Sequence, residues 1–280
     1  TGVATHALHA RLAAPESTVL SFGTRHVHPS IAAMVERSAL LAGLDGVSNV
    51  AGAEEIGREA GGTMPHALII CFGRGEQEVA WQAFDEAVGP DVPRVALCDT
   101  YDDEVEESLR AAKAIDGLDS VRLDTTSSRR GDFVQICREV REKLDLRGFD
   151  DVGIFASGGI TPEAQRRLRD IVEGFGVGSY VSNADPLDFA LDITALEGEP
   201  AAKRGKLDGP RAVYRTGDGQ HLSLPESEQP PDHATALLEP LVRDGEIVRE
   251  FDIDAAAERA LGDAEDVGLA TAVYNGTQDP

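Results

Sequence analysis

The sequence predicts an α/β protein: an irregular, TIM-like parallel barrel of about seven strands, with a small C-terminal appendage. Short apolar runs alternate with longer helical stretches from residue 18 to about residue 195. The runs are apolar almost throughout, which is typical of parallel strands covered by helices on both faces. Near residue 196 the composition changes and the alternation stops. An open doubly wound sheet is the alternative arrangement of these elements.

The expected elements follow one another in a regular order. The predicted strands are Thr18–Phe22, Leu44–Ser48, His66–Phe72, Arg94–Cys98, Ser120–Leu123, Val152–Ala156 and Phe175–Tyr180. The predicted helices are Ser30–Leu41, Glu76–Val88, Asp103–Ala114, Asp132–Leu144 and Pro162–Val172. A further run, Asp188–Ile193, fits either an eighth strand or a helix. Since most strands are followed by a helix, the strands should run parallel.

The second part of the chain has a different character. Glycine, proline and charged residues dominate from residue 197 to 209, and a polar, proline-bearing loop follows near 225–232. A final helix is predicted over Asp254–Leu261. We therefore assign residues 1–196 to the barrel and residues 197–280 to the appendage.

The charge balance limits the partners. Fifty acidic residues against 26 basic ones give a formal net charge of −24, and only four of the basic residues are lysines. Such a surface repels nucleic acid and anionic lipid, so neither is an expected partner. An acidic excess spread along the chain is typical of proteins that work in high salt, where ions screen the self-repulsion. An ordinary acidic protein is the alternative.

The cysteines and the apolar stretches indicate the compartment. Cys71, Cys98 and Cys137 lie too far apart for a metal-binding spacing, and the first two each end an apolar run. We expect buried thiols in a reducing cytosol. No apolar stretch is long enough to cross a bilayer and no signal-peptide pattern is present, so we expect a cytoplasmic protein without membrane contact. The chain begins at Thr1 without a methionine, directly in a helix-like sequence, which indicates a fragment of something longer.

Polar side chains follow the predicted strands, at the end of a parallel barrel where active sites lie. The segments are Gly23-Thr-Arg-His-Val-His-Pro29, Gly61-Gly-Thr-Met-Pro-His66, Asp99-Thr-Tyr-Asp102, Arg122-Leu-Asp124, Ser127-Ser-Arg-Arg-Gly-Asp132, Ser157-Gly-Gly-Ile160 and Gly176-Val-Gly-Ser-Tyr180. Together they predict one polar site at the barrel mouth.

Glycine-bearing turns after the last two strands indicate a phosphate site. Glycine lets backbone N–H groups approach a phosphate, and a following helix N-terminus favours the negative charge. Ser157-Gly-Gly-Ile160 leads into a helix with Thr161 as the expected N-cap and Pro162 in its first turn. Two structural turns without a ligand are the alternative.

Charged residues at the same end suit a sugar phosphate. Asp99 and Asp124 could hold ribose hydroxyls, or Mg²⁺ carried by a pyrophosphate. Arg25 and Arg122 suit a carboxylate or a pyrophosphate. The alternatives are a helix cap or ion pair for each aspartate and a structural ion pair for each arginine.

These motifs together resemble nicotinate phosphoribosyltransferases of the shorter microbial type. The resemblance covers most of residues 1–250 and rests on Thr1-Gly-Val-Ala-Thr5, Ser21-Phe-Gly-Thr-Arg-His-Val-His-Pro29, Gly62-Thr-Met-Pro-His66, Asp99-Thr-Tyr-Asp102, Val121-Arg-Leu-Asp124, Ser157-Gly-Gly159 and Phe175-Gly-Val-Gly-Ser-Tyr-Val-Ser-Asn183. It implies transfer of phosphoribose from phosphoribosyl pyrophosphate to nicotinate, giving nicotinate mononucleotide and pyrophosphate for NAD salvage. It also implies coupling to ATP hydrolysis through a phosphorylated histidine.

The resemblance assigns the roles of individual residues. His66 would carry the phosphoryl group, although a plain hydrogen-bond donor is the alternative. Arg25 would bind pyrophosphate, Arg122 the nicotinate side, and Asp99 and Asp124 the ribose or the ring. The 5′-phosphate would be held by Ser157, Gly158, Gly159, Gly178 and Ser179. Mg²⁺ would arrive with the pyrophosphate, without protein ligands, and ATP would be a co-substrate.

Two departures and two rivals accompany this interpretation. The family's N-terminal β-rich domain is absent, so the activity of this chain alone is in question, and a homo-oligomer is expected to cover the exposed surface. The segment Tyr214–Pro240 has no cysteine, which excludes a thiolate zinc site there. Quinolinate phosphoribosyltransferase is the nearest rival. That family has a lysine directly after the first-strand arginine, whereas this sequence has His26 at that position. A non-catalytic phosphate-binding or assembly subunit is the other rival.

Overall fold

A computed structural model describes residues 1–125 and 131–277. Contacts divide the chain into two compact units: residues 1–186 together with the C-terminal segment from residue 253, and residues 187–252. The sequence-based division into residues 1–196 and 197–280 differs from this one in two ways: residues 187–196 fall in the second unit, and the C-terminal helices pack with the first. Each unit is described by itself below.

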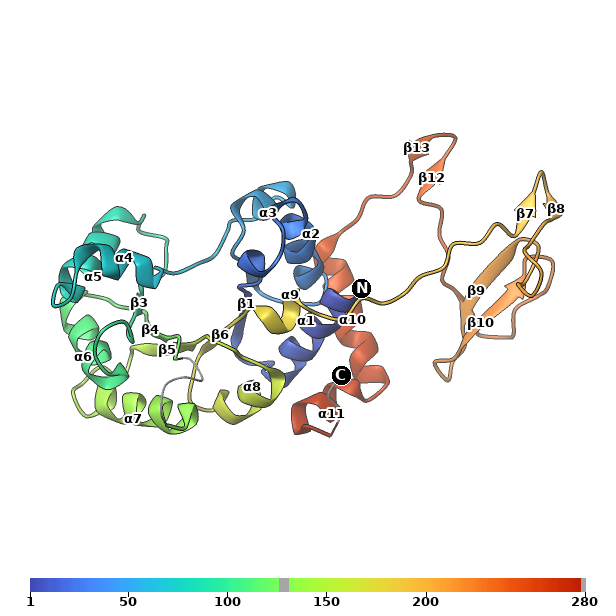
Figure 1. The fold of residues 1–280 in the computed structure, drawn as a ribbon. Coiled ribbons are helices and arrows are strands. Elements are labelled where there is room, and N and C mark those ends of the chain that lie inside the picture. The colour runs from blue at the N-terminus through green and yellow to red at the C-terminus, as the bar shows by residue number, and fades with distance from the viewer. Residues whose placement is uncertain (126–130, 278–280) are drawn as a thin grey trace. The chain divides into compact units, whose positions relative to one another are not determined.

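The first unit is built on one parallel sheet of six strands in the order β2-β1-β6-β5-β4-β3. The strands are β1 (Thr18–Ser21), β2 (Gly46–Val47), β3 (Val95–Leu97), β4 (Ser120–Leu123), β5 (Gly153–Ala156) and β6 (Gly174–Val177). The sheet curls into a half barrel, with β2 and β3 as its edges (Figure 1). The α/β class and the parallel strands are confirmed, whereas a seven-stranded closed barrel is not.

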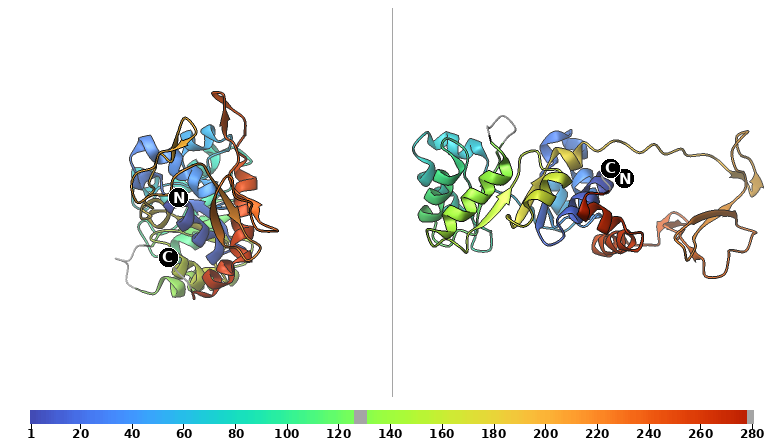
Figure 2. Two further views of the ribbon diagram at one scale, coloured as in Figure 1. Left: turned by 90° about the vertical axis from the view of Figure 1, so that its right-hand side faces the viewer. Right: turned by 90° about the horizontal axis from the view of Figure 1, so that it is seen from below.

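Helices cover the convex side of this sheet. They are α1 (Gly2–Ala13), α2 (Pro29–Leu40), α3 (Val50–Glu55), α4 (His66–Phe72), α5 (Gln77–Ala87), α6 (Glu104–Ala114), α7 (Phe133–Asp145) and α8 (Pro162–Leu168). Neighbours pack in the order α3, α2, α1, α8, α7, α6, α5 and α4, which follows the strand order across the sheet (Figure 2). Four of the five predicted helices agree with α2, α5, α6 and α7 to within one residue at each end, and α8 ends earlier, at Leu168.

The prediction of a strand over His66–Phe72 is wrong, because this run forms helix α4. Ile69 is fully buried there, but Ile70 and Phe72 are 55% and 39% exposed. A strand enclosed by helices would bury the whole run, whereas a short amphipathic helix buries one side of it. The helix ends at Gly73, whose φ of +107° favours glycine. Cys71 is exposed on the same helix, contrary to expectation, while Cys98 and Cys137 are buried.

Glycines in β6 allow aromatic rings to lie close to the strand. A Cβ atom at Gly174 would lie 2.6 Å from the ring of Phe155, and one at Gly176 would collide with the ring of Phe22. Phe175 and Val177, which alternate with them, are fully buried. β6 therefore has side chains on one face and is bare on the other.

The C-terminal segment returns to the first unit as α10 (Ile253–Asp266) and α11 (Leu269–Asn275). The predicted helix over Asp254–Leu261 is thus present and longer. Ala264 and Val273 are buried with Leu12 and Ala13 of α1 in a small apolar cluster. Arg166 Nη1 also donates to the carbonyl oxygen of Val273 at 3.1 Å.

The second unit, residues 187–252, consists of short antiparallel strands. These are β7 (Ala195–Leu196), β8 (Glu199–Pro200), β9 (Arg211–Arg215), β10 (His221–Pro225), β11 (Thr235–Ala236), β12 (Val242–Arg243) and β13 (Glu246–Ile247). The run Asp188–Ile193 forms neither a strand nor a helix. None of the residues described in this unit is buried. Across the described part of the chain, no helix is long and apolar enough to cross a membrane.

Candidate functional site

The carboxyl ends of β1, β4, β5 and β6 surround a pocket of about 560 Å³. Its lining includes Arg25, His66, Arg122, Asp124, Ser157, Gly158, Gly159, Gly178 and Ser179. These are all the predicted site residues except Asp99, which lies directly behind His66. The sheet therefore brings the predicted site together, because parallel strands place their carboxyl ends at one edge.

His66 is the first residue of α4, and its ring lies between two carboxylates and a hydroxyl. Its Nε2 lies 3.7 Å from Asp99 Oδ1 and 3.7 Å from Asp124 Oδ2. Its Nδ1 lies 3.1 Å from Thr100 Oγ1. Although α4 is a helix rather than the expected strand, it delivers the histidine to the pocket.

The charges of this cluster shift its protonation equilibria. The interaction with Asp124 is the main cause that raises the pKa of His66, and Asp99 adds to it. Burial raises the pKa of Asp99 to about 6. Burial alone would also raise the pKa of Asp124, but His66 and Arg122 outweigh it and the pKa falls. A raised pKa favours the protonated imidazole, which can donate a proton or bind an anion.

Arg122 is buried and interacts with the charge of His66. Its Nη2 donates to Asp124 Oδ2 at 3.1 Å, and its Nη1 donates to the hydroxyl of Thr63 and to the Met64 carbonyl. Its guanidinium lies 5.7 Å from the ring centre of Phe22. Nε is buried without a hydrogen-bond partner among the described residues. Arg122 thus fixes the segment before α4 and presents positive charge to the pocket.

The turn after β5 has the backbone that a phosphate site needs. Gly158 and Gly159 have φ values of +81° and +70°, which side chains disfavour. A Cβ atom at Gly158 would lie 2.7 Å from Asp124 Oδ1, whereas one at Gly159 would meet nothing within 4 Å. The Thr161 side chain caps α8, as predicted, by accepting the Ala164 N–H. Gly158 therefore lets the turn approach Asp124, and Gly159 leaves its backbone open to the pocket.

The turn after β1 carries Arg25 and His26 in the short 3₁₀ helix η1 (Thr24–His26). Burial, followed by the charge of Arg25, lowers the pKa of His26. A Cβ atom at Gly178 would lie 3.0 Å from His26 Nε2, so glycine brings this turn and the β6 end together. His28 caps α2 instead, accepting the Ser30 N–H, and does not line the pocket.

Several residues that support the site were not predicted from the sequence. Glu36 of α2 is fully buried and accepts the Thr24 hydroxyl at 2.5 Å. Glu107 of α6 is fully buried and accepts backbone N–H groups of the turn after β3. Thr63 and Thr100 lay within the motifs singled out, but their hydroxyls were given no role. A buried acid on a helix facing a strand-end turn leaves no distinct signal in one sequence.

A metal site made by protein ligands alone is not found in the described residues, which contain no group of three potential ligands from His, Cys, Asp and Glu. Of the predicted segment Ser127–Asp132, residues 127–130 lie outside the described residues. Asp132 caps α7 and forms an ion pair with Arg167 at 2.9 Å.

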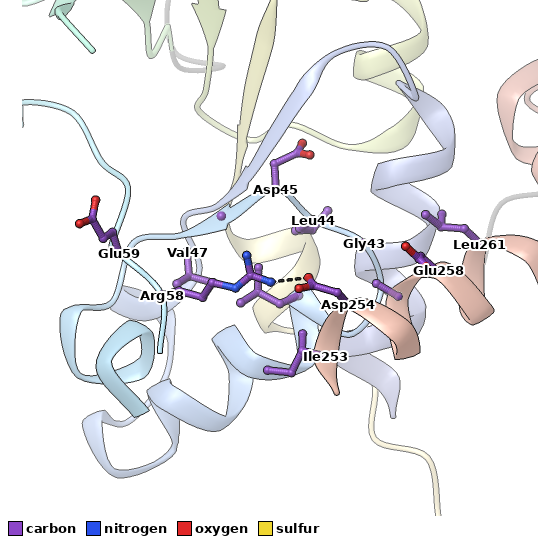
Figure 3. A pocket seen from close by; sticks show the side chains of 13 residues that line it. Gly43, Leu44, Asp45, Val47, Arg58, Glu59, Ile253, Asp254, Glu258 and Leu261 are labelled. Carbon is purple, nitrogen blue, oxygen red and sulfur yellow. Dashed lines mark hydrogen bonds and ion pairs between the residues drawn. The ribbon is translucent and has the colours of Figure 1, made fainter. Parts of the chain in front are cut away.

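A second pocket, of about 580 Å³, lies beside the β2 edge of the first unit. It is formed by the turn before β2, by Arg58 and Glu59, and by α10 (Figure 3). Arg58 reaches across it to an ion pair with Asp254. It contains none of the predicted site residues, so we take the pocket around His66 as the candidate active site.

Residues 3–192 match the family model described as the C-terminal domain of quinolinate phosphoribosyl transferase. The chain belongs to this family. The matched region contains the whole six-stranded sheet and every residue that lines the His66 pocket. The candidate site therefore lies within the domain that the family model describes.

Two curated relatives are nicotinate phosphoribosyltransferases of Mycobacterium tuberculosis. One, pncB2, is 31% identical over 253 residues, which cover 83% of this chain and 52% of the relative. The other, pncB1, is 28% identical over 279 residues, which cover 92% of this chain and 61% of the relative. The chain thus spans little more than half the length of these relatives.

Two solved structures extend the comparison. A nicotinate-nucleotide pyrophosphorylase from Pyrococcus furiosus superposes with a TM-score of 0.86 and 47% identity, covering 96% of this chain and 70% of that one. Human nicotinic acid phosphoribosyltransferase gives a TM-score of 0.71 at 21% identity, covering 93% and 67%, and supports the fold alone. The family model and the relatives agree on a phosphoribosyltransferase family.

Proposed function

We propose that this protein is a nicotinate phosphoribosyltransferase of NAD salvage. The pyridine nitrogen of nicotinate would bond to C1′ of phosphoribosyl pyrophosphate, and the bond from C1′ to the pyrophosphate oxygen would break. The observation that carries the proposal is His66, held between two carboxylates opposite the open Gly158-Gly159 turn. The names of the Mycobacterium tuberculosis relatives support the same assignment.

The residues divide between the two ends of the substrate. In this proposal the glycine turn, Ser157, Gly178 and Ser179 hold the 5′-phosphate, and Arg25 binds the pyrophosphate. Arg122 faces the nicotinate carboxylate, while Asp99 and Asp124 hold the ribose or the ring. Their main contribution would be to position the reactants and stabilise the departing charge. Mg²⁺ would be bound by the pyrophosphate, as the family resemblance implies.

The predicted coupling to ATP would use His66. A nitrogen of its ring would take the γ-phosphoryl group, ADP would leave, and the phosphohistidine would later be hydrolysed. Magnesium, ATP and a homo-oligomer are predictions of the family resemblance and are proposed here on that ground. For this step the accepting ring nitrogen must be unprotonated. Asp99 and Asp124, whose carboxylate oxygens each lie 3.7 Å from Nε2, would take up its proton, and Arg122 beside Asp124 would supply positive charge for the incoming phosphoryl group.

The family description favours a second candidate, quinolinate phosphoribosyltransferase, which would release CO₂ in addition. Quinolinate carries a second carboxylate and needs a further cation. In this pocket the position after Arg25 is His26, whose lowered pKa disfavours the cationic form of the ring. This observation favours nicotinate.

The test is formation of nicotinate mononucleotide from nicotinate, phosphoribosyl pyrophosphate and Mg²⁺ in molar KCl, with and without ATP. We expect ATP to stimulate the protein and to have no effect on His66→Asn. The control is His28→Asn, since His28 lies on the same segment as Arg25 but outside the pocket. Turnover of quinolinate in place of nicotinate would overturn the substrate assignment. Repeating the assay with any coding sequence upstream of Thr1 tests the predicted N-terminal domain.

A further inference from the structure

One carboxylate outside the pocket organises the whole turn that follows β3. Glu107 Oε2 accepts the Thr100 N–H at 2.8 Å, and Oε1 accepts the N–H groups of Tyr101 at 2.9 Å and Asp102 at 3.1 Å. Gln77 Nε2 adds a fourth hydrogen bond to Oε1 at 3.1 Å. Three consecutive backbone groups are therefore fixed by one side chain.

The burial of Glu107 shows that this arrangement is specific. The residue is 0% exposed, and a buried carboxylate is costly unless several donors satisfy it. Here backbone N–H groups and an amide replace water, and such charge-assisted hydrogen bonds are stronger than neutral ones. Glu107 also lies in the first turn of α6, where the helix dipole favours negative charge.

The turn that Glu107 holds supplies two of the groups around His66. Thr100 Oγ1 lies 3.1 Å from Nδ1, and Asp99 Oδ1 lies 3.7 Å from Nε2. Asp99 Oδ2 in turn accepts the Asp124 N–H at 2.8 Å, which ties this turn to the end of β4. A shift of the turn would therefore move both partners of the imidazole at once.

We propose that Glu107 is a positioning residue for His66. By holding the turn after β3, it keeps the Thr100 hydroxyl on Nδ1 and turns Nε2 toward Asp99, Asp124 and the pocket. The partner of one ring nitrogen fixes the role of the other, and small displacements of a reacting group reduce rates strongly. The inference deepens the proposed function of His66, but the orientation of its ring can be measured without any substrate.

The experiment follows the imidazole of His66 by ¹H–¹⁵N NMR as a function of pH, with His66→Asn identifying its signals. The charged groups that face this ring in the described structure are Asp99, Asp124 and Arg122. Thr100→Val removes the partner of Nδ1, and we expect the titration midpoint to fall by about half a pH unit or more. Glu107→Gln replaces an acceptor oxygen by a donor facing N–H groups, and should give a similar fall.

Matched variants separate positioning from general stability. Thr100→Ser keeps the hydroxyl and should retain the midpoint of the unaltered protein, and so should Glu106→Gln, an exposed neighbour on α6. In the double variant Glu107→Gln/Thr100→Val, the titration midpoint of His66 should be no lower than in either single variant, because both substitutions act through the same contact with Nδ1. If Glu107→Gln does not fold, the Thr100 pair still tests the contact with Nδ1.

An unchanged midpoint in both Thr100→Val and Glu107→Gln would overturn the proposal, even if both proteins melted at lower temperature. Failure of the unaltered protein to use nicotinate would instead count against the proposed function. In an active protein, Glu107→Gln should lose a larger share of the ATP-stimulated rate than of the basal rate without ATP, because the turn also carries Asp99. Loss of both rates in equal measure would argue for a merely structural role.

Discussion

At the scale of single residues, the buried carboxyl group of Asp99 makes the stability of the fold depend on pH. Burial raises the pKa of Asp99 from 3.8 to about 6. Between about pH 4 and pH 6, Asp99 keeps its proton in the folded protein, whereas the same carboxyl group has lost it in the unfolded chain. The contribution of Asp99 to stability is therefore complete below about pH 4 and is lost as the pH rises through 6. Above that pH the ionised group opposes folding, with partial relief from His66.

We therefore expect Asp99→Asn to stabilise the protein near pH 7.5 and to lower its activity. The gain in the free energy of unfolding should be on the order of 1–2 kcal/mol, and should shrink toward zero at pH 4. The amide oxygen can still accept the Asp124 N–H, so the fold is preserved. Thermal unfolding at both pH values measures the difference, and the exposed Asp116→Asn is the control. An equal gain at both pH values would refute the ionic explanation.

The two glycines after β5 allow a matched comparison. Gly158→Ala and Gly159→Ala both place a side chain at positive φ, which costs about 1–2 kcal/mol. Only Gly158→Ala also brings a Cβ atom to 2.7 Å from Asp124 Oδ1. We expect the larger loss of stability for Gly158→Ala, together with weaker binding of phosphoribosyl pyrophosphate. Urea denaturation and titration calorimetry measure the two effects, and equal losses of stability would contradict the close contact.

At the scale of elements, six of the seven predicted strands overlap observed strands, and the third candidate is wrong. The last predicted strand, Phe175–Tyr180, runs too far, because β6 ends at Val177 and the short helix α9 (Ser179–Ser182) follows it. Residues 67–72 are all apolar, and a short apolar run has no periodicity that separates strand from helix. Tertiary packing decided the outcome, since only Ile69 is fully buried in the core. The motif ending in His66 was nevertheless placed correctly at the pocket, because the first residue of a helix can occupy the position of a strand end.

Packing of the C-terminal helices on the first unit is testable by truncating buried side chains. Val273 of α11 is fully buried against α1, whereas Val248 of the second unit is 51% exposed. We expect Val273→Ala to cost about 1–2 kcal/mol and Val248→Ala to cost little. Denaturant unfolding followed by the fluorescence of Trp81, which is buried in the first unit, reports whether either substitution destabilises that unit. Equal effects would argue that α11 is not part of the first unit.

At the scale of the whole molecule, the net charge of −24 governs the response to salt. Raising KCl from 0.1 M to 2 M shortens the screening length from about 10 Å to below 3 Å, so repulsion among the 50 acidic residues is removed. We expect the melting temperature to rise over this range. A variant with ten exposed acids changed to Asn or Gln should show a shallower rise. A melting temperature that is independent of salt would contradict adaptation to high salt.

The residues that line the candidate site could be predicted from the sequence better than the buried residues that hold them in place. Strand-end residues such as Arg122 and Asp124 could be placed because parallel strands bring their ends together. Glu36 and Glu107 could not, because they lie within helices whose pattern alone does not show which turns they face. Pocket residues thus follow from topology, and the acids behind them follow only from three-dimensional packing.

The bare face of β6 links residues far apart in the sequence. Since the rings of Phe155 and Phe22 occupy the space where side chains of residues 174 and 176 would lie, each glycine and its aromatic partner can change only together. A saturation mutagenesis screen should reject even alanine at both glycines, while Gly176→Ala should be partly rescued by Phe22→Leu. During evolution, changes at these two positions of β6 would then occur as compensating pairs of substitutions.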